Sequence, residues 1–170
     1  YETGTYPDVK RNLVLVQCAQ CKNPACQEVC PTGATTQRDD GIVVVDYDKC
    51  MGCGSCEVAC PYGTRQLYRD ERFYFGDQSI PPETLPHELR YEHQKFRPGA
   101  ATKCVFCCHR IDEGLKKGLR PGVDVEATPA CVVSCPVAAR CFGDLEDPDS
   151  EISQLLRSRD GFPLLKDMGT

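Results

Sequence analysis

Short hydrophobic runs separated by turn-forming residues make up most of the chain. Residues 34–46 contain β-prone runs on both sides of Asp40-Gly41, a pair typical of tight turns, so we expect a β-hairpin there. A comparable strand is predicted around Gln66–Tyr68 and Arg72–Phe75. The strands indicated by this pattern are all short.

The helices indicated by the pattern are short as well. Ala25–Val29 and Ser55–Ala59 each predict a single helical turn that leads to a Cys-Pro pair. Glu151–Arg157 has apolar residues at helical spacing, and the preceding Asp149-Ser150 offers an N-cap, so we expect an amphipathic helix. Residues 76–103 contain several prolines and are predicted to form a long insertion loop on the surface.

The apolar composition is too thin to build an ordinary core. Hydrophobic residues make up 41% of the 170 residues, but 14 of them are cysteines, and there is no Trp. A core this poor normally needs disulfides or metal for stability. The net charge of −5 gives no indication of nucleic-acid binding, and no apolar run approaches the roughly 20 residues of a membrane span. Because the chain starts at Tyr1, without Met or a secretory signal, we expect native sequence upstream.

The cysteines fall into three ordered sets, each of which ends in Cys-Pro followed by similar small residues. The first is Cys18-x2-Cys21-x4-Cys26-x3-Cys30, and the second is Cys50-x2-Cys53-x2-Cys56-x3-Cys60. The third is Cys104-x2-Cys107 followed, after a long insertion, by Cys131-x3-Cys135. Three recurrences of one pattern indicate a duplicated unit.

The second set has the spacing of bacterial ferredoxins, in which the fourth cysteine binds the other cluster of a pair. Two-residue gaps let one tight loop place three thiolates at three corners of a cubane. The fourth thiolate lies beyond a helical turn and points away, and proline ends that turn. We therefore expect one [4Fe–4S] cluster bound by Cys18, Cys21, Cys26 and Cys60, and a second bound by Cys50, Cys53, Cys56 and Cys30.

Other uses of these cysteines fit the pattern less well. A structural zinc site needs pairs of cysteines and not triplets. A disulfide scaffold would be expected with a secretory signal, and a thioredoxin-like protein would have one Cys-x-x-Cys pair. The sequence shows no nucleophile–base pair and no open metal position, so we predict electron transfer without catalysis.

Exchange of ligands between the first two sets leaves the third set without a partner. Either its four cysteines bind one cluster, or a fourth set lies upstream of Tyr1; the abrupt start favours the second alternative. Cys104, Cys107 and Cys131 would then bind a third cluster with an upstream ligand, and Cys135 would bind a fourth cluster together with upstream residues. Two further cysteines, Cys108 and Cys141, are expected to be small buried hydrophobes, with Cys141 in a strand.

The sequence resembles the four-cluster iron–sulfur subunits of the dimethyl sulfoxide reductase family of molybdenum oxidoreductases. The resemblance runs over the whole chain and is carried by Tyr1–Lys10, Cys26–Ala34, Val45–Cys53, Cys107–Gly114 and Phe142–Glu151. In that family a further cysteine set precedes the segment matching Tyr1–Lys10 and shares two clusters with the set matching Cys104 to Cys135.

The resemblance implies an α+β fold of two fused ferredoxins, with short hairpins and short helices around [4Fe–4S] clusters and long insertion loops. The expected organisation is a ferredoxin-like unit at 1–75, an insertion loop at 76–103, a second ferredoxin-like half at 104–145, and an acidic segment with a helix at 146–170. Two clusters would be liganded within the chain, and up to four with an upstream segment.

The resemblance also implies partners. These would be a large molybdopterin catalytic subunit and a quinone-reactive membrane anchor subunit, with the chain held at the membrane through them. The cytoplasmic side is favoured over the periplasmic side. The alternative is an iron–sulfur subunit of another redox complex, of the hydrogenase or formate dehydrogenase type, or a freestanding polyferredoxin.

Overall fold

A computed structural model describes residues 2–11, 14–69, 97–159, 161 and 164–165 of the chain. Short strands and short helices are joined by long loops, so the predicted α+β class is confirmed. The strands are β1 (Glu2–Thr3), β2 (Lys10–Arg11), β3 (Thr35–Gln37), β4 (Val43–Val45), β5 (Gln66–Leu67) and β6 (Ala101–Thr102). The helices are α1 (Ala25–Glu28), α2 (Ser55–Ala59), α4 (Cys108–Lys116), η3 (Val125–Ala127), α5 (Ala130–Val133) and α6 (Glu151–Ser158).

The predicted hairpin around Asp40-Gly41 is confirmed. Strands β3 and β4 pair antiparallel, with Thr35 opposite Val45. Asp40 Oδ1 accepts a hydrogen bond from the Ile42 backbone N–H at 3.1 Å, and Gly41 has a φ of +80°. The turn therefore needs the conformational freedom of glycine at this position.

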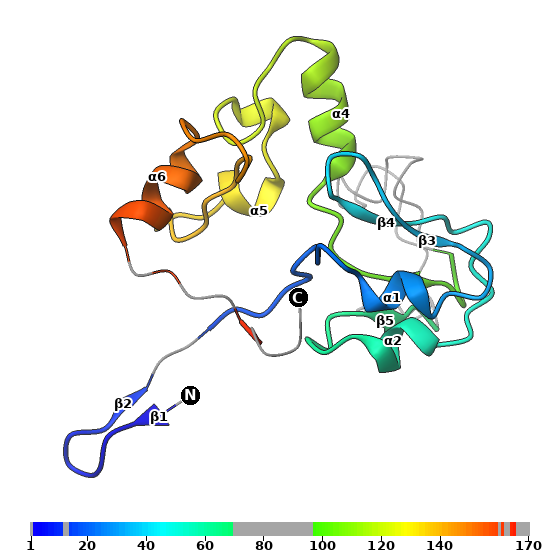
Figure 1. The fold of residues 1–170 in the computed structure, drawn as a ribbon, viewed down its shortest axis with the longest axis horizontal. Helices are drawn as coiled ribbons and strands as arrows, with labels where there is room; N and C mark the ends of the chain where they lie inside the picture. Colours follow the sequence, from blue (N-terminus) through cyan, green and yellow to red (C-terminus); the bar gives the residue numbers. More distant parts are fainter. Residues whose placement is uncertain (1, 12–13, 70–96, 160, 162–163, 166–170) are drawn as a thin grey trace, which may run out of the picture.

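The two predicted helical turns are also confirmed, as α1 and α2. They pack against each other at the bottom of the lobe that contains β3, β4 and β5 (Figure 1). The small core of this lobe consists of Ala34, Cys50, Cys56, Ala100 and Ala101. Two of these five buried residues are cysteines from the predicted cluster-binding sets, so the core surrounds the candidate sites.

The end of the segment predicted as an insertion loop, 76–103, forms a strand. Strand β6 pairs antiparallel with β5, and Ala100 and Ala101 are 0% and 2% exposed. Small side chains let this strand lie close against the second cysteine set. The predicted strand at Arg72–Phe75 and residues 76–96 of the loop lie outside the described residues.

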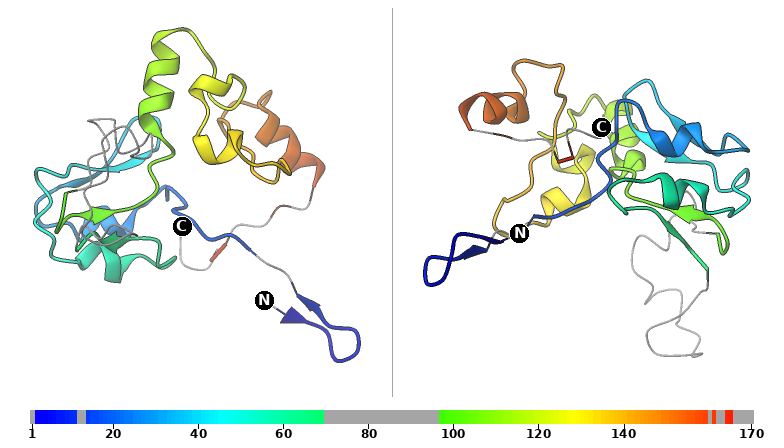
Figure 2. Two further views of the ribbon diagram at one scale, coloured as in Figure 1. Left: turned by 180° about the vertical axis from the view of Figure 1, so that it is seen from behind. Right: turned by 60° about the horizontal axis from the view of Figure 1, so that its bottom comes forward.

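A second lobe contains α4, η3, α5 and α6, and Figure 2 shows it beside the first lobe from two further directions. Helix α4 was not predicted. Its buried face carries Ile111 and Gly114, which pack on η3. A Cβ added at Gly114 would lie 2.3 Å from the Ala127 Cβ, so this close approach requires glycine. The charged residues of α4 obscured its narrow apolar face in the sequence.

Helix α6 confirms the predicted amphipathic helix. The Ser150 Oγ accepts a hydrogen bond from the Ser153 backbone N–H at 3.3 Å, as an N-cap should. The predictions for Cys141 are wrong: it lies outside any strand and is exposed. Cys141 lies in a loop after α5, and no strand in the described part of the chain pairs with this loop to cover its side chain. Cys108 is half-buried in the first turn of α4.

Several polar contacts between described residues join the lobes, and two of them involve the β3–β4 hairpin. Arg38, in the hairpin turn, donates to both carboxylate oxygens of Asp112 on α4, at 2.9 and 2.5 Å. Gln20 Nε2 donates to the Cys104 carbonyl at 2.8 Å, while Gln20 Oε1 accepts from the Val43 backbone N–H at 2.8 Å. The hairpin, the first cysteine set and the third set are thereby fixed relative to one another.

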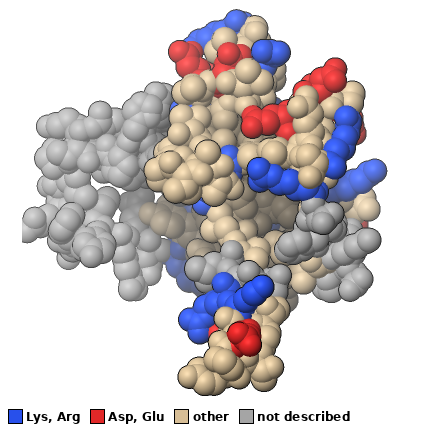
Figure 3. All heavy atoms as spheres, turned by 90° about the vertical axis from the view of Figure 1, so that its left-hand side faces the viewer, with Lys and Arg blue, Asp and Glu red and all other residues tan. Residues whose placement is uncertain are grey.

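Charges are mixed on the visible surface. On the face shown in Figure 3, basic and acidic side chains lie next to one another and do not separate into one basic and one acidic area. Among the residues that the structure describes, none of the helices has the length and apolar character needed to span a bilayer.

Candidate iron–sulfur sites

Two cavities in the first lobe are each lined by four cysteines. The first cavity is lined by Cys18, Cys21, Cys26 and Cys60, together with Val43, Arg65 and neighbouring residues. The second cavity is lined by Cys30, Cys50, Cys53 and Cys56, together with Thr35, Gly52 and Ala101 among others. Each cavity thus combines three cysteines of one set with the last cysteine of the other set. This is the grouping that the spacing predicts, and ligation itself stays a prediction.

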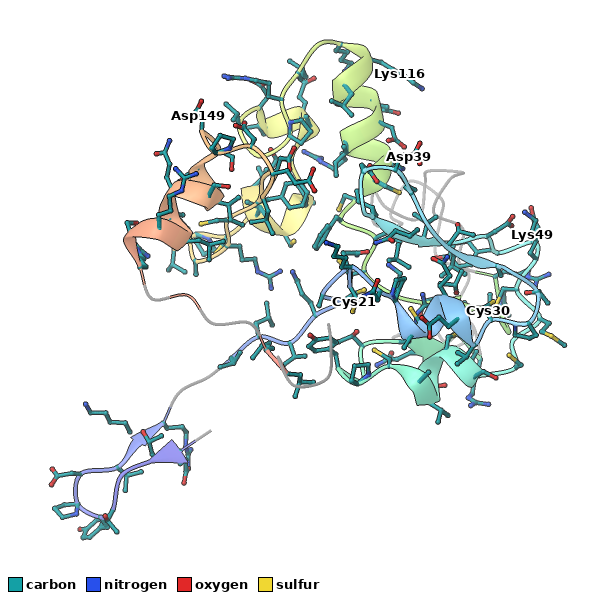
Figure 4. All side chains as sticks on the ribbon, viewed as in Figure 1. Cys21, Cys30, Asp39, Lys49, Lys116 and Asp149 are labelled. Carbon is teal, nitrogen blue, oxygen red and sulfur yellow. The ribbon has the colours of Figure 1, made fainter. Side chains whose placement is uncertain are left out.

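Helix α1 lies between the cysteines of the first set that line the first cavity and Cys30, which lines the second. Cys21 and Cys30 lie near opposite ends of this helix in Figure 4. Cys26 is the second residue of α1, Cys56 is the second residue of α2, and Cys131 is the second residue of α5. The third cysteine of every set therefore has the same position in a short helix, and the fourth follows the end of that helix.

The turn after the fourth cysteine also recurs in all three sets. In each, the backbone N–H three residues later donates to the cysteine carbonyl, and the donor residue has positive φ. The donors are Gly33 to Cys30 (3.2 Å, φ +63°), Gly63 to Cys60 (3.1 Å, φ +60°) and Ala138 to Cys135 (3.2 Å, φ +47°). The alanine in the third set adopts a conformation that favours glycine, so the third turn keeps the geometry despite its sequence.

These turns direct backbone N–H groups at the thiol sulfur. Burial raises the pKa of Cys30, but hydrogen bonds from the backbone N–H groups of Thr35 and Ala34 and from Thr32 outweigh it and lower the pKa to about 7. Burial also raises the pKa of Cys60, but hydrogen bonds from Thr64 and the neighbouring backbone outweigh it, so the pKa is lowered. The fourth cysteine of a set therefore favours the thiolate, which is the form that binds iron.

The loop between the first two cysteines recurs as well. The residue just before the second cysteine of each set has positive φ, at +50° for Gln20, +73° for Gly52 and +52° for Phe106. In the second set the turn is also crowded, because a Cβ at Gly52 would lie 2.1 Å from the Gly99 carbonyl oxygen. The three loops thus share one backbone form although their sequences differ.

In the third set, Cys104 and Cys131 lie close enough for their thiols to interact electrostatically. Burial raises the pKa of Cys104, and the nearby thiols of Cys18 and Cys131 raise it further. Cys107 is the N-cap of α4, with a φ of +51°. Cys135 has different neighbours: the backbone N–H of Ala139 donates to its sulfur at 3.3 Å and is the main cause of its lowered pKa.

Sequence reasoning missed several residues at these sites. The Ala101 backbone N–H donates to the Cys50 sulfur at 3.4 Å, and Arg97 donates to the Cys50 carbonyl. Lys103 is half-buried, and loss of hydration lowers its pKa; its Nζ donates to Gln20 Oε1 at 3.2 Å. In the sequence these residues are marked only by their position shortly before Cys104. The pairing of β6 with β5, which brings them to the sites, has no local sequence signal.

Both cavities suit a [4Fe–4S] cluster in their donor sets. Each offers four thiols around one hollow, and the hollows contain about 410 and 320 Å³ of space free of protein atoms, their open mouths included. Backbone N–H groups directed at sulfur are the expected second layer of such a site. Within the described residues, no three His, Cys, Asp or Glu side chains are arranged to hold a single metal ion.

Comparison with known proteins places this arrangement in a class. Residues 9–74 match the 4Fe-4S dicluster domain family, and this segment contains the first two cysteine sets. A provisionally named dimethyl sulfoxide reductase iron–sulfur subunit of Halobacterium salinarum is 42% identical over 99% of this chain and 58% of its own length. The arsenate respiratory reductase iron–sulfur subunit of Shewanella sp. is 34% identical over 98% of this chain and 75% of its own length.

The chain belongs to the iron–sulfur subunits of the dimethyl sulfoxide reductase family of molybdoenzymes. A third relative, the Hdr-like menaquinol oxidoreductase iron–sulfur subunit 1 of Archaeoglobus fulgidus, is 40% identical over 95% of this chain and 55% of its own length. The chain thus spans somewhat more than half the length of two of these three relatives.

Proposed function

We propose that the chain is the electron-transfer subunit of an oxidoreductase complex and relays electrons between a molybdopterin catalytic subunit and a quinone-reactive membrane subunit. The observation that carries the proposal is the pair of cavities, each lined by four thiols drawn from two sets. Family membership supports it, because the relatives are named as iron–sulfur subunits of reductases.

The ligand assignment is part of the proposal. Cys18, Cys21, Cys26 and Cys60 hold one [4Fe–4S] cluster, and Cys50, Cys53, Cys56 and Cys30 hold another. A bound cluster takes up and releases one electron at a time. The chain's own residues fix its place and surroundings: the Cys-Pro turns aim N–H groups at sulfur, and buried Ala34, Val43 and Ala101 limit access of water.

The third set is proposed to hold two further clusters jointly with residues upstream of Tyr1. Cys104, Cys107 and Cys131 serve one of them, and Cys135 serves the other. The recurrence of the Phe106 and Ala138 conformations supports a cluster-binding role for this set. The proposed units are accordingly 1–75 and 104–145, with 76–103 inserted between them and 146–170 after them, in a duplicated ferredoxin-like arrangement.

The chain's role is proposed to be non-catalytic, with attachment to the membrane through a partner subunit on the cytoplasmic side. Protease treatment of spheroplasts and of inverted vesicles tests this location. Cleavage of the chain only in inverted vesicles supports it, and cleavage in intact spheroplasts contradicts it.

One experiment tests the main proposal. The native full-length polypeptide is purified without oxygen from its source, and its iron, acid-labile sulfide, zinc and molybdenum are measured. We expect a brown protein with [4Fe–4S] clusters and little zinc, which copurifies with a large molybdopterin subunit. A colourless, folded protein loaded with zinc would end the proposal.

A second candidate is a subunit of a redox complex without molybdenum. The 40% identity to a menaquinol oxidoreductase iron–sulfur subunit favours it. The same purification separates the two candidates, because copurification with a large subunit that contains no molybdenum supports the second.

A further inference from the structure

The position five residues after the last cysteine of a set differs between the two cavities. This residue is Thr35 in the first set, Arg65 in the second and Arg140 in the third. Thr35 lines the second cavity and Arg65 lines the first, so matched positions face the two candidate clusters. One cavity therefore has a hydroxyl where the other has a guanidinium.

Arg65 is buried to an unusual degree for an arginine. It is 2% exposed and has one of the largest fully buried side chains in the described part of the chain. Its Nη1 donates to Thr35 Oγ1 at 3.0 Å. Its Nε and Nη2 are buried and have no hydrogen-bond partner among protein atoms.

A buried guanidinium with two free donors is stable only next to negative charge. The ion pairs between described residues do not include Arg65, so no carboxylate supplies that charge there. Arg65 lines the first cavity with its four thiols, and its charge opposes the rise in the pKa of Cys26 that burial causes. The unpaired N–H groups of Arg65 and the thiols of the first set therefore belong to the same cavity.

We propose that Arg65 raises the reduction potential of the first-cavity cluster above that of the second-cavity cluster. The inference rests on the proposed function, since it requires a cluster in each cavity. Reduction adds one electron, supplied by the neighbouring redox centre, and no proton. A fixed positive charge at the cavity wall therefore favours the reduced form, and N–H groups directed at sulfur act in the same direction. Thr35 provides no such charge in the second cavity, and Arg97, which donates to the Cys50 carbonyl there, is an exposed residue whose charge is screened by solvent.

The test is a redox titration of the full-length, cluster-loaded protein, followed by electron paramagnetic resonance under anaerobic conditions with dithionite as reductant. In Arg65→Gln we expect the reduced-to-oxidised ratio of the first-cavity cluster to fall at least about tenfold at a fixed potential, a shift of about −59 mV for a one-electron couple. The second-cavity cluster should shift much less. In Arg65→Lys, which keeps the charge, most of the potential should be retained.

Two variants separate charge from structure. Thr35→Val removes the hydrogen bond to Arg65 but keeps the guanidinium, so the first-cavity potential should stay near its original value. Arg140→Gln makes the same charge change at the matched position of the third set, where Arg140 is half-buried and donates to Gln17 Oε1 at 3.4 Å. It should leave the first-cavity potential unchanged. Equal shifts in Arg65→Gln and Thr35→Val, or no shift in Arg65→Gln, overturn the proposal.

A further measurement requires no change at Arg65, in case Arg65→Gln does not fold. In the unchanged protein the first-cavity signal should have a higher potential than the second-cavity signal. Cys53→Ser assigns the second-cavity signal and Cys21→Ser the first-cavity signal, since each cysteine lines only one of the two cavities. If the signal altered by Cys53→Ser has the higher potential, the proposal is overturned. Absence of any cluster signal from the unchanged protein would contradict the proposed function instead.

Discussion

Replacing Gly52 by alanine should disrupt the second cavity selectively. Gly52 lies between Cys50 and Cys53 with a φ of +73°, and the Gly99 carbonyl covers it. Gln20 and Phe106 show that the matched position accepts a side chain at positive φ in the other two sets. Glycine is therefore needed at position 52 mainly because of the covering carbonyl, and only in part because of φ.

The magnitude follows from two contributions. A left-handed conformation costs an L-residue about 1–2 kcal/mol. The new Cβ would lie 2.1 Å from the Gly99 oxygen, whereas carbon–oxygen contacts normally begin near ~3.3 Å, so the carbonyl must move by roughly 1 Å. Overpacking of this kind costs about 1–3 kcal/mol, and Gly52→Ala should destabilise the lobe by about 2–5 kcal/mol in all.

Gly41→Ala is the matched control. Gly41 has a φ of +80° in the β3–β4 turn, and a Cβ there would meet no atom within 4 Å. It should therefore cost only the conformational part, about 1–2 kcal/mol. The difference between the two variants isolates the contact with Gly99.

The assay is anaerobic urea unfolding of the cluster-loaded protein, followed by the visible absorption of the clusters, with iron analysis before unfolding. Gly52→Ala should lower the midpoint more than Gly41→Ala and lose about four iron atoms per chain, corresponding to one [4Fe–4S] cluster. The first-cavity signal should persist, because the Gly99 carbonyl and the Ala101 N–H contact only the second set. Equal midpoints and equal iron contents in the two variants would refute the reasoning.

Three further predictions concern ligation and the contact between the lobes. Cys60→Ser should perturb the first-cavity cluster and not the cluster of its own triplet, and spectra with only the second-cavity signal altered would show that no ligands are exchanged. Cys108→Ala and Cys141→Ala should leave iron and sulfide per chain unchanged; a loss of four iron atoms in either would make that cysteine a ligand. A double-mutant cycle with Arg38→Gln and Asp112→Asn should give a coupling of only about 0.2–1 kcal/mol, since both side chains are partly exposed. Hydrogen bonding to Arg38 lowers the pKa of Asp112, so this coupling should be present above about pH 4, the ordinary carboxyl range, and be lost as the pH falls through the lower folded value. Coupling that persists in acid would contradict the assignment.

Local sequence signals predicted the elements whose causes are local. The Asp40-Gly41 turn, the helical turns before Cys30 and Cys60, and the Ser150 N-cap each depend on residues within a few positions of one another. Helix α4 escaped prediction because its apolar face is narrow and is completed by η3, which lies about ten residues further along the chain. Strand β6 escaped because its partner β5 lies more than 30 residues away.

The same division holds for the candidate sites. Spacing alone was enough to group the first eight cysteines as the cavities group them, since the reach of a tight loop is a local property. The surroundings of the sulfur atoms were not accessible in this way. Arg65 and Ala101 reach the cavities, and Lys103 reaches Gln20 in the loop of the first set, through strand pairing and burial. A single sequence contains no local sign of either.

The short helices explain why one set is expected to serve two clusters. Helix α1 has four residues, and at about 1.5 Å per residue it places Cys26 near its start about 6 Å along the axis from Cys30 beyond its end. The Cys-Pro turn then fixes the Cys30 sulfur among the N–H groups that follow it, away from its own triplet. Cys131 and Cys135 have the same relation to α5, and the turn after Cys135 has the same hydrogen bond and the same positive φ at Ala138. By the same geometry we expect Cys135 to face a cluster on the far side of α5, and not the cluster of Cys104, Cys107 and Cys131.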